Sequence, residues 1–119
     1  MKIFALDDVQ QHLTIYNKMF GAIGFLTPGK LLDAMIHDQP DLLLCDLVMP
    51  NFDGWVMIRA ARELCPKMPI IVATSKCDIS QKQLATQLGC LFWCKDGNYR
   101  SLRDMITEVE QSCIELVKK

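Results

Sequence analysis

The stretch Asp41-Leu-Leu-Leu-Cys-Asp-Leu-Val-Met-Pro-Asn-Phe-Asp-Gly54 decides the fold. Its apolar run, Asp41 to Cys45, is too short for a helix and lies between Pro40 and Pro50. A run of this kind is typical of a strand buried on both faces, as a parallel sheet requires. Asp46 ends the strand and turn residues follow at once. Because the carboxyl ends of parallel strands face the crevice where ligands bind, Asp46 is a candidate site residue as well as a candidate turn cap.

The rest of the chain repeats this strand-then-helix pattern. Further strands are predicted at Lys2 to Leu6, Ala22 to Thr27, Ile70 to Thr74 and Cys90 to Cys94. Helices are predicted at His12 to Phe20, Lys30 to Asp38, Gly54 to Leu64 with Asp53 as N-cap, Ile79 to Leu88, and Tyr99 to Val117. Five such rounds predict an α/β fold with a doubly wound, five-stranded parallel sheet and five helices.

Composition narrows the class of protein. The 119 residues are enough for one domain, half of them are hydrophobic, and the formal net charge is −1. This charge gives no reason to expect direct nucleic-acid or membrane binding. No stretch suits a signal peptide or a membrane span, so we expect a cytoplasmic protein.

The chain has six cysteines, which are Cys45, Cys65, Cys77, Cys90, Cys94 and Cys113. They form no Cys-x-x-Cys motif, and the two histidines are distant from them in sequence. We expect most of them to be small buried hydrophobic residues in a reducing cytosol rather than disulfide or metal ligands, with redox sensing as the alternative.

Polar residues end four of the five predicted strands. Asp7 and Asp8 follow the first, Asp46 the third, Thr74 ends the fourth and Lys95 follows the fifth. Two carboxylates about 5 Å apart repel by roughly 3 kcal/mol at an effective dielectric constant near 20, so three of them require a cation. Oxygen ligands favour Mg²⁺ or Mn²⁺. A carboxylate beside such a metal can attack phosphorus, and the hydroxyl and ammonium groups can hold phosphoryl oxygens.

With these residues the whole chain resembles the receiver (CheY-like) domains of bacterial two-component response regulators. The motifs that carry the resemblance are Asp7-Asp8, Asp46-x-x-Met49-Pro50-x-x-Asp53-Gly54, Thr74-Ser75 and Lys95. The resemblance implies the flavodoxin-like strand order 2-1-3-4-5 and a single receiver domain over residues 1–119, with no output domain in this chain.

The resemblance also implies roles for individual residues. Asp46 would be the phospho-acceptor. Asp8 would bind Mg²⁺ directly and Asp7 mainly through water, with the Asp46 carboxylate and the Val48 backbone carbonyl as further ligands.

Three residues would act on the phosphoryl group or report it. Thr74 would contact that group and signal its presence, and Lys95 would pair with the Asp46 carboxylate or its phosphate. Phe92 falls where the family has its rotating switch aromatic, with the adjacent Trp93 as the alternative. The family usually has proline after the lysine, where this chain has Asp96. A cis bond to a non-proline residue costs about 2.5–4 kcal/mol, so we expect a different loop after Lys95.

The resemblance further implies a phosphorelay module that catalyses only its own phosphorylation and dephosphorylation. Its partners would be a sensor histidine kinase or histidine phosphotransferase and an output protein, and it would be a monomer or a phosphorylation-dependent dimer. Binding would use the face formed by the fourth and fifth strands and the helices after them.

Two other classes share this topology. A flavodoxin-like cofactor binder needs a glycine- and hydroxyl-rich phosphate loop after the first strand, where this chain has Asp7 and Asp8. A phosphohydrolase acting through an aspartyl phosphate needs an acid two residues after the nucleophile, where this chain has Val48.

Overall fold

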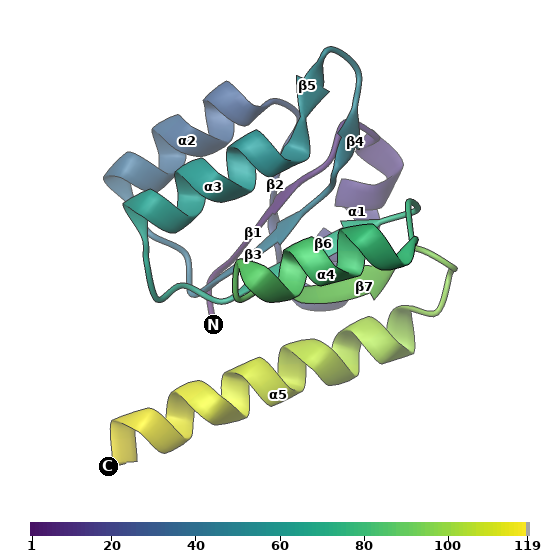
Figure 1. Ribbon diagram of the computed structural model, residues 1–119. Coiled ribbons are helices and arrows are strands. Elements are labelled where there is room, and N and C mark those ends of the chain that lie inside the picture. The colour runs from purple at the N-terminus through teal and green to yellow at the C-terminus, as the bar shows by residue number, and fades with distance from the viewer. Residues whose placement is uncertain (119) are drawn as a thin grey trace.

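A computed structural model describes the backbone of residues 1–118 and the side-chain surroundings of residues 1–113. Strands and helices alternate along the chain (Figure 1). In order they are β1 (Ile3–Leu6), α1 (Gln10–Phe20), β2 (Ile23–Phe25), α2 (Pro28–His37), β3 (Leu42–Cys45), β4 (Val48–Met49), β5 (Phe52–Asp53), α3 (Gly54–Leu64), β6 (Ile70–Thr74), α4 (Ile79–Gln87), β7 (Leu91–Cys94) and α5 (Tyr99–Lys118).

The main sheet has five strands in the order β2-β1-β3-β6-β7, and every neighbouring pair is parallel. Counted without the small hairpin, this is the predicted order 2-1-3-4-5. The two predicted features of the fold, a doubly wound sheet and five helices, are therefore confirmed. The strands β4 and β5 form a separate antiparallel pair, where the sequence predicted only a turn.

Most predicted boundaries lie within two residues of the observed ones. Helix α3 and strand β6 have the predicted bounds, while α1 begins two residues earlier than predicted. Helix α1 ends at Gly21, whose φ of 69° lies in the left-handed region that glycine adopts without strain. Strand β2 is shorter than predicted and covers only Ile23–Phe25 at the edge of the sheet.

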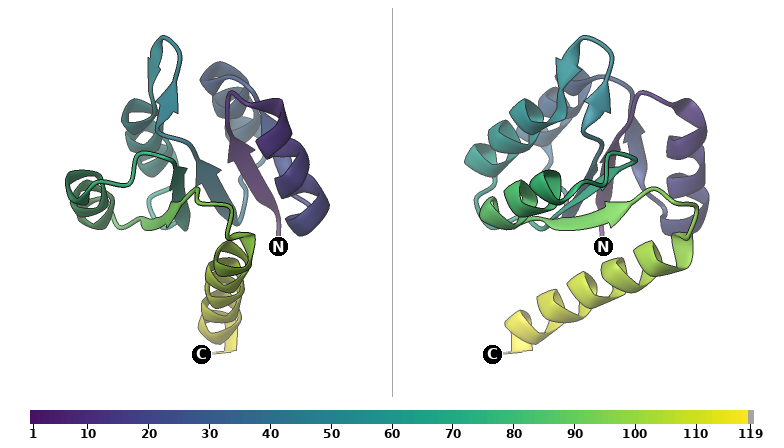
Figure 2. Two further views of the ribbon diagram at one scale, coloured as in Figure 1. Left: turned by 90° about the vertical axis from the view of Figure 1, so that its right-hand side faces the viewer. Right: turned by 45° about the vertical axis from the view of Figure 1, so that its right-hand side comes forward.

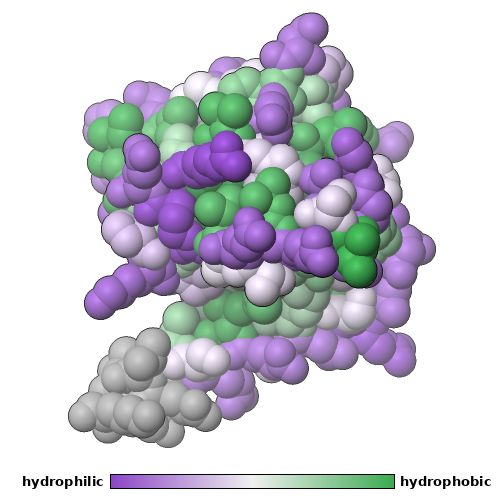
Figure 3. Space-filling view, in the orientation of Figure 1, coloured by the Kyte–Doolittle hydropathy of each residue, from purple (hydrophilic) through white to green (hydrophobic). Residues whose placement is uncertain are grey.

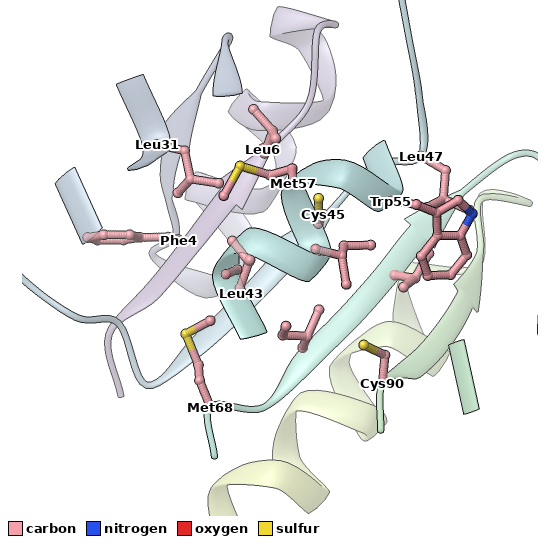
Figure 4. Packing of buried hydrophobic residues seen from close by; sticks show 14 of the residues in the cluster. Phe4, Leu6, Leu31, Leu43, Cys45, Leu47, Trp55, Met57, Met68 and Cys90 are labelled. Atoms are coloured by element: carbon pink, nitrogen blue, oxygen red, sulfur yellow. The ribbon is translucent and has the colours of Figure 1, made fainter. Parts of the chain in front are cut away.

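Helices lie on both sides of the sheet (Figure 2). Two hydrophobic clusters fill the space between the sheet and these helices. One cluster joins the sheet to α2, α3 and α4, and the other joins it to α1 and α5. Figure 4 shows the first cluster, with Leu43 and Cys45 of β3 facing Met57 of α3. All four β3 residues are buried, as a central strand covered on both faces must be.

Among residues 1–118, no helix combines the length and the apolar character that a membrane crossing requires.

Candidate functional site

The carboxyl ends of the central strands bring the predicted site residues to one edge of the sheet. Asp7 follows β1, Asp46 follows β3, and Thr74 ends β6, and all three are buried, with exposed fractions of 1%, 5% and 0%. Carboxylate oxygens of Asp7, Asp8 and Asp46 all lie within 4.8 Å of one another. Buried polar groups need partners, so the contacts made by these side chains decide what the site can do.

Lys95 supplies the positive charge of this cluster. Its Nζ lies 2.5 Å from Asp7 Oδ2 and 3.2 Å from Asp46 Oδ2, and its side chain is 11% exposed. One ammonium group therefore pairs with two carboxylates that burial would otherwise leave uncompensated. The backbone fixes this position, because Lys95 N donates to the carbonyl of Thr74 at 2.8 Å.

Asp46 lies in the least favourable place for a negative charge. Burial raises the pKa of the Asp46 carboxyl above its ordinary value; the Lys95 ammonium opposes the shift and the Asp7 carboxylate adds to it. The Val48 backbone N–H donates to Asp46 Oδ1 at 3.3 Å, which favours the carboxylate. Asp46 is thus a buried carboxylate with an ammonium group on one side and two acids on the other.

The three acids fit a divalent cation that prefers oxygen ligands. Their oxygens are close enough to share one ion, and like charges at this separation repel unless a cation lies among them. Lys95 already occupies one side of the cluster, where it neutralises Asp7 and Asp46. Among residues 1–113, no ammonium group makes such a contact with Asp8, which leaves its carboxylate available on the open side.

The chain turns sharply after Asp46 to form the small β4–β5 hairpin, and two residues permit this turn. Asn51 adopts a φ of 60°, and the Gly54 N–H donates to Leu47 O at 3.1 Å. A Cβ at position 54 would lie 2.4 Å from the Asp46 carbonyl oxygen, so only glycine fits. Asp53 then caps α3, as predicted, by accepting a hydrogen bond from Trp55 N at 2.9 Å.

A pocket of about 370 Å³ opens between this hairpin and the start of α4. Met49, Asp53, Lys76 and Gln81 are among its lining residues. Trp55 Nε1 donates to Gln81 Oε1 at 2.7 Å and so connects α3 to α4 across the pocket.

Thr74 holds its hydroxyl in a short turn at the end of β6. Thr74 Oγ1 accepts a hydrogen bond from Lys76 N at 3.1 Å. This bond uses the oxygen as acceptor, so the hydroxyl proton of Thr74 is available for another partner. The loop between β6 and α4 therefore sets the direction in which this hydroxyl points.

His12 is a site residue that the sequence pattern did not reveal. Its Nδ1 lies 3.0 Å from Asp7 Oδ2 and 3.4 Å from Lys95 Nζ. Asp7 Oδ1 accepts from Val9 N at 2.9 Å, so both carboxylate oxygens of Asp7 have partners. The signal that could have revealed His12 is its place in the first turn of the helix that follows the two acids.

Phe92 and Trp93 point to opposite faces of the sheet. Phe92 is half-buried against the α4-side cluster, with Lys82 Nζ 6.0 Å from its ring centroid. Trp93 is buried in the α5-side cluster, and its Nε1 donates to Asn98 O and Ser101 Oγ. Trp93 is thus held by packing and hydrogen bonds, while Phe92 is the more loosely held aromatic of the two.

The expectation for the cysteines is wrong at two positions. Cys45, Cys65 and Cys90 are free and buried, as predicted, but Cys77 and Cys94 form a disulfide with a Cα–Cα distance of 5.7 Å. Cys94 is the residue of β7 paired with Thr74 of β6, and the loop after Thr74 returns Cys77 to the same place. The two cysteines are 17 residues apart, and only the parallel pairing of β6 and β7 makes them neighbours.

The loop after Lys95 contains no cis bond, since all peptide bonds of residues 1–118 are trans. Asp96 N donates to Cys94 O at 2.8 Å, and Asp96 Oδ1 accepts from Asn98 N at 2.9 Å. Gly97 has a φ of 89°, which reverses the chain before α5. Asp96 therefore builds a turn from its own side chain in the place where the family usually has proline.

Known proteins match this chain in sequence and in fold. A family model described as the response regulator receiver domain matches residues 3–107. The sporulation initiation phosphotransferase F of Bacillus subtilis is 24% identical over 111 residues, which cover 88% of this chain and 90% of that protein. The DNA-binding transcriptional regulator NtrC of Klebsiella pneumoniae is 32% identical over 65 residues, or 55% of this chain.

The chain covers only 14% of that regulator's length. Among solved structures, a CheY-like receiver domain protein from Methanospirillum hungatei superposes with a TM-score of 0.86 at 21% identity, covering 96% of this chain and 97% of that one. Receiver domains are signalling domains, and the fold, the strand order and the matched residues agree with them. The chain belongs to the response regulator receiver domain family.

Proposed function

We propose that this receiver accepts one phosphoryl group on Asp46 from a phosphohistidine of a sensor kinase or histidine phosphotransferase. The observation that carries the proposal is the buried Asp46 carboxylate, 3.2 Å from Lys95 Nζ and within 4.8 Å of two further acids. The family assignment favours this function over a cofactor binder or a phosphohydrolase. We place the reaction in the cytoplasm, where such kinases present their phosphohistidine.

In the transfer step, an Asp46 carboxylate oxygen forms the new P–O bond while the P–N bond to the donor imidazole breaks. Lys95 lies within reach of the transferred group because it already contacts Asp46 Oδ2. The buried hydroxyl of Thr74 can donate its proton to a second phosphoryl oxygen, since its own oxygen is held by Lys76 N. Both residues stabilise negative charge that water would stabilise less in this buried place.

Mg²⁺ or Mn²⁺ would be held by Asp8 directly, by Asp7 mainly through water, and by Asp46 and the Val48 carbonyl. The bound ion would neutralise negative charge on the phosphoryl oxygens. The same acids repel one another unless a cation lies among them, so this cluster is where the ion would bind.

The labelling experiment uses acetyl phosphate or phosphoramidate with Mg²⁺ and reads intact mass. Wild type should gain one phosphoryl group, and Asp46→Asn should gain none because an amide is a poor nucleophile. Asp41→Asn is the matched control, since Asp41 precedes the same strand at its opposite end and is exposed. Labelling of Asp46→Asn at the wild-type level would contradict the assignment.

Metal binding has its own test in the melting temperature. Mg²⁺ should raise it in wild type by binding only to the folded state. Asp8→Ala should abolish that rise, while Asp7→Ala should weaken it less. Equal shifts in wild type and Asp8→Ala would place the ion elsewhere.

For output, we propose that phosphorylation draws Thr74 toward the phosphoryl group and lets Phe92 turn from its half-buried position toward the core. The face formed by α4, β7 and α5 would then change its affinity for an output protein. This requires two states separated by a few kcal/mol, with the phosphoryl group favouring one of them. A Phe92→Ala variant should still label at Asp46 but lose the phosphorylation-dependent gain in partner affinity; an undiminished gain would remove Phe92 from the switch.

A further inference from the structure

The disulfide lies on the loop that the receiver would have to move. Cys77 comes three positions after Thr74, which ends β6, and just before α4. Cys94 ends β7 and directly precedes Lys95, the ammonium group of the site. The bridge thus fastens the loop between β6 and α4 to the strand that leads to Lys95 (Figure 1).

Exposure distinguishes this pair from three of the four free cysteines, Cys45, Cys65 and Cys90. Cys77 and Cys94 are both half-buried, so a small thiol or disulfide can reach them. Burial raises the pKa of the thiols of Cys45, Cys65 and Cys90, which keeps them neutral and poorly reactive.

Proximity also favours reaction at this pair. The Cα atoms of Cys77 and Cys94 are 5.7 Å apart, a separation that a disulfide spans without backbone movement. A mixed disulfide on one of the two cysteines therefore lies within reach of the thiolate of the other.

We propose that Cys77 and Cys94 form a reversible thiol–disulfide exchange site, with small-molecule disulfides of the glutathione type as substrate. The disulfide form holds the loop between Thr74 and Asp78 in its resting position, and the dithiol form frees it. The link to phosphorylation rests on the proposed function of Asp46, while the exchange itself does not.

The reaction balances as two exchange steps. One cysteine thiolate attacks the substrate disulfide and forms a mixed disulfide as the first small thiolate leaves. The second cysteine thiolate then attacks the protein sulfur of that mixed disulfide, which closes the Cys77–Cys94 bond and releases the second small thiolate. The two cysteines lose two electrons, the substrate disulfide gains them, and the two cysteine protons end on the released thiols or in solvent.

The resting position of the loop is visible in its hydrogen bonds. Thr74 Oγ1 accepts from Lys76 N at 3.1 Å, and the Thr74 carbonyl accepts from Lys95 N at 2.8 Å. If Thr74 moves toward a phosphoryl group while the Lys76 N–H stays bonded to its Oγ1, Lys76 and Cys77 are displaced with it. Because Cys77 is bonded to a strand residue, the disulfide opposes that displacement, and its reduction removes the opposition.

The first experiment titrates the whole protein in mixtures of reduced and oxidised glutathione, traps thiols with iodoacetamide and locates the label by peptide mass. In wild type, Cys77 and Cys94 should lose their iodoacetamide label together as the share of oxidised glutathione rises, with one common midpoint. Cys94→Ser should instead stop at a glutathione mixed disulfide on Cys77. Cys113→Ser is the matched control, since Cys113 is a half-buried free cysteine, and should leave the midpoint unchanged. Free thiols at 77 and 94 in every mixture, or a wild type that stops at mixed disulfides, would overturn the proposal.

The second experiment compares amide hydrogen exchange in the oxidised and reduced wild-type protein. Reduction should speed exchange at Lys76 and its loop neighbours by at least about fivefold, while the amides of β3 change little. Equal loop rates in the two forms would show that the bridge does not hold the loop.

The third experiment repeats the glutathione titration after phosphorylation with acetyl phosphate and Mg²⁺. If phosphorylation favours the freed loop, the midpoint should move toward the dithiol by about fivefold or more, as reciprocal coupling requires. An unmoved midpoint in a protein labelled at Asp46 would refute the coupling. Absence of label in both redox forms would instead refute the proposed function and leave the exchange result standing.

Discussion

Two neighbouring strand–helix units on the same face of the sheet, β3–α3 and β6–α4, differ in how firmly they pack. Helix α3 buries five residues, which are Gly54, Trp55, Met57, Ile58 and Ala61. Helix α4, all of whose residues the structure describes, buries only Ala85. Figure 3 shows this face, where hydrophobic and hydrophilic side chains alternate over the surface. Ile79, at the start of α4, is 72% exposed.

This difference in packing coincides with the two tasks proposed for the site, which are accepting the phosphoryl group and passing on the signal. The well-packed unit carries Asp46, the proposed acceptor, while the loosely packed unit carries Thr74 and leads to the proposed output face. Elements with few buried apolar contacts open at low free-energy cost. The packing therefore holds the proposed acceptor carboxylate more firmly than it holds α4.

The largest test of this comparison removes one side chain from each helix. Ile58→Ala in α3 should lower the free energy of unfolding by about 2 to 5 kcal/mol, because its side chain is fully buried. Leu84→Ala in α4 should cost less than half as much, because Leu84 is only half-buried against the same cluster. Urea unfolding measures both values, and equal losses would abolish the distinction between the units.

A second test removes the contact that holds the end of α4. The Arg62 guanidinium of α3 donates to Leu88 O at 3.2 Å, Gly89 O at 3.3 Å and Met68 O at 2.5 Å. Arg62→Met should cost about 1 to 3 kcal/mol, since it leaves these carbonyls without their charged donor.

The location of the effect sharpens this second test. Hydrogen exchange of α4 should accelerate more than that of α3. Arg62→Lys is the control variant, and it should recover only part of the loss because an ammonium group lacks the planar fork of the guanidinium. Uniform acceleration of both helices would show that Arg62 supports the whole core rather than α4.

The smallest effect concerns the charge of Asp46 in the firmly packed unit. Burial raises its folded-state pKa above the ordinary value of 3.8, so the folded protein binds the proton more tightly than the unfolded chain. Stability must then fall as pH rises from that ordinary value through the folded-state pKa. Asp46→Asn removes the titration, and without metal it should raise the melting temperature at neutral pH by a few degrees.

The difference in melting temperature between wild type and Asp46→Asn should disappear when the pH falls below the ordinary carboxyl pKa. Thermal melts in EDTA from about pH 3 to about pH 8 measure this gap, and added Mg²⁺ should narrow it at neutral pH by stabilising wild type. A less stable Asp46→Asn at neutral pH would show that the contact with Lys95 outweighs burial.

The sheet and the acid cluster were predictable from the sequence for the same reason. Short apolar runs bounded by prolines define strands such as β3, and parallel strands place their ends on one edge, so strand pattern alone puts Asp7, Asp46 and Thr74 together. The roles of these residues remain proposals, but their proximity was predictable. Local pattern and topology were sufficient for this part.

Other features depend on contacts that no local pattern encodes. The pair Cys77 and Cys94 has no motif spacing and meets only because β6 and β7 are neighbours. His12 reaches Asp7 from the next helix, and Arg62 donates to the carbonyl of Leu88, 26 residues away in sequence. The β4–β5 pair has two residues in each strand, too few for an alternating pattern to appear.

The hydrogen bond between Trp55 and Gln81 has an optical consequence. Trp55 lines the pocket between the hairpin and α4, and its indole N–H donates to Gln81 of α4, so its fluorescence should change when that helix moves. Trp93 of β7 lies on the opposite face of the sheet, where its indole N–H donates to Asn98 and to Ser101 of α5. Its emission should therefore stay constant. A Trp93→Phe variant would isolate the first signal, so the chain carries its own reporter of α4 and needs no attached dye.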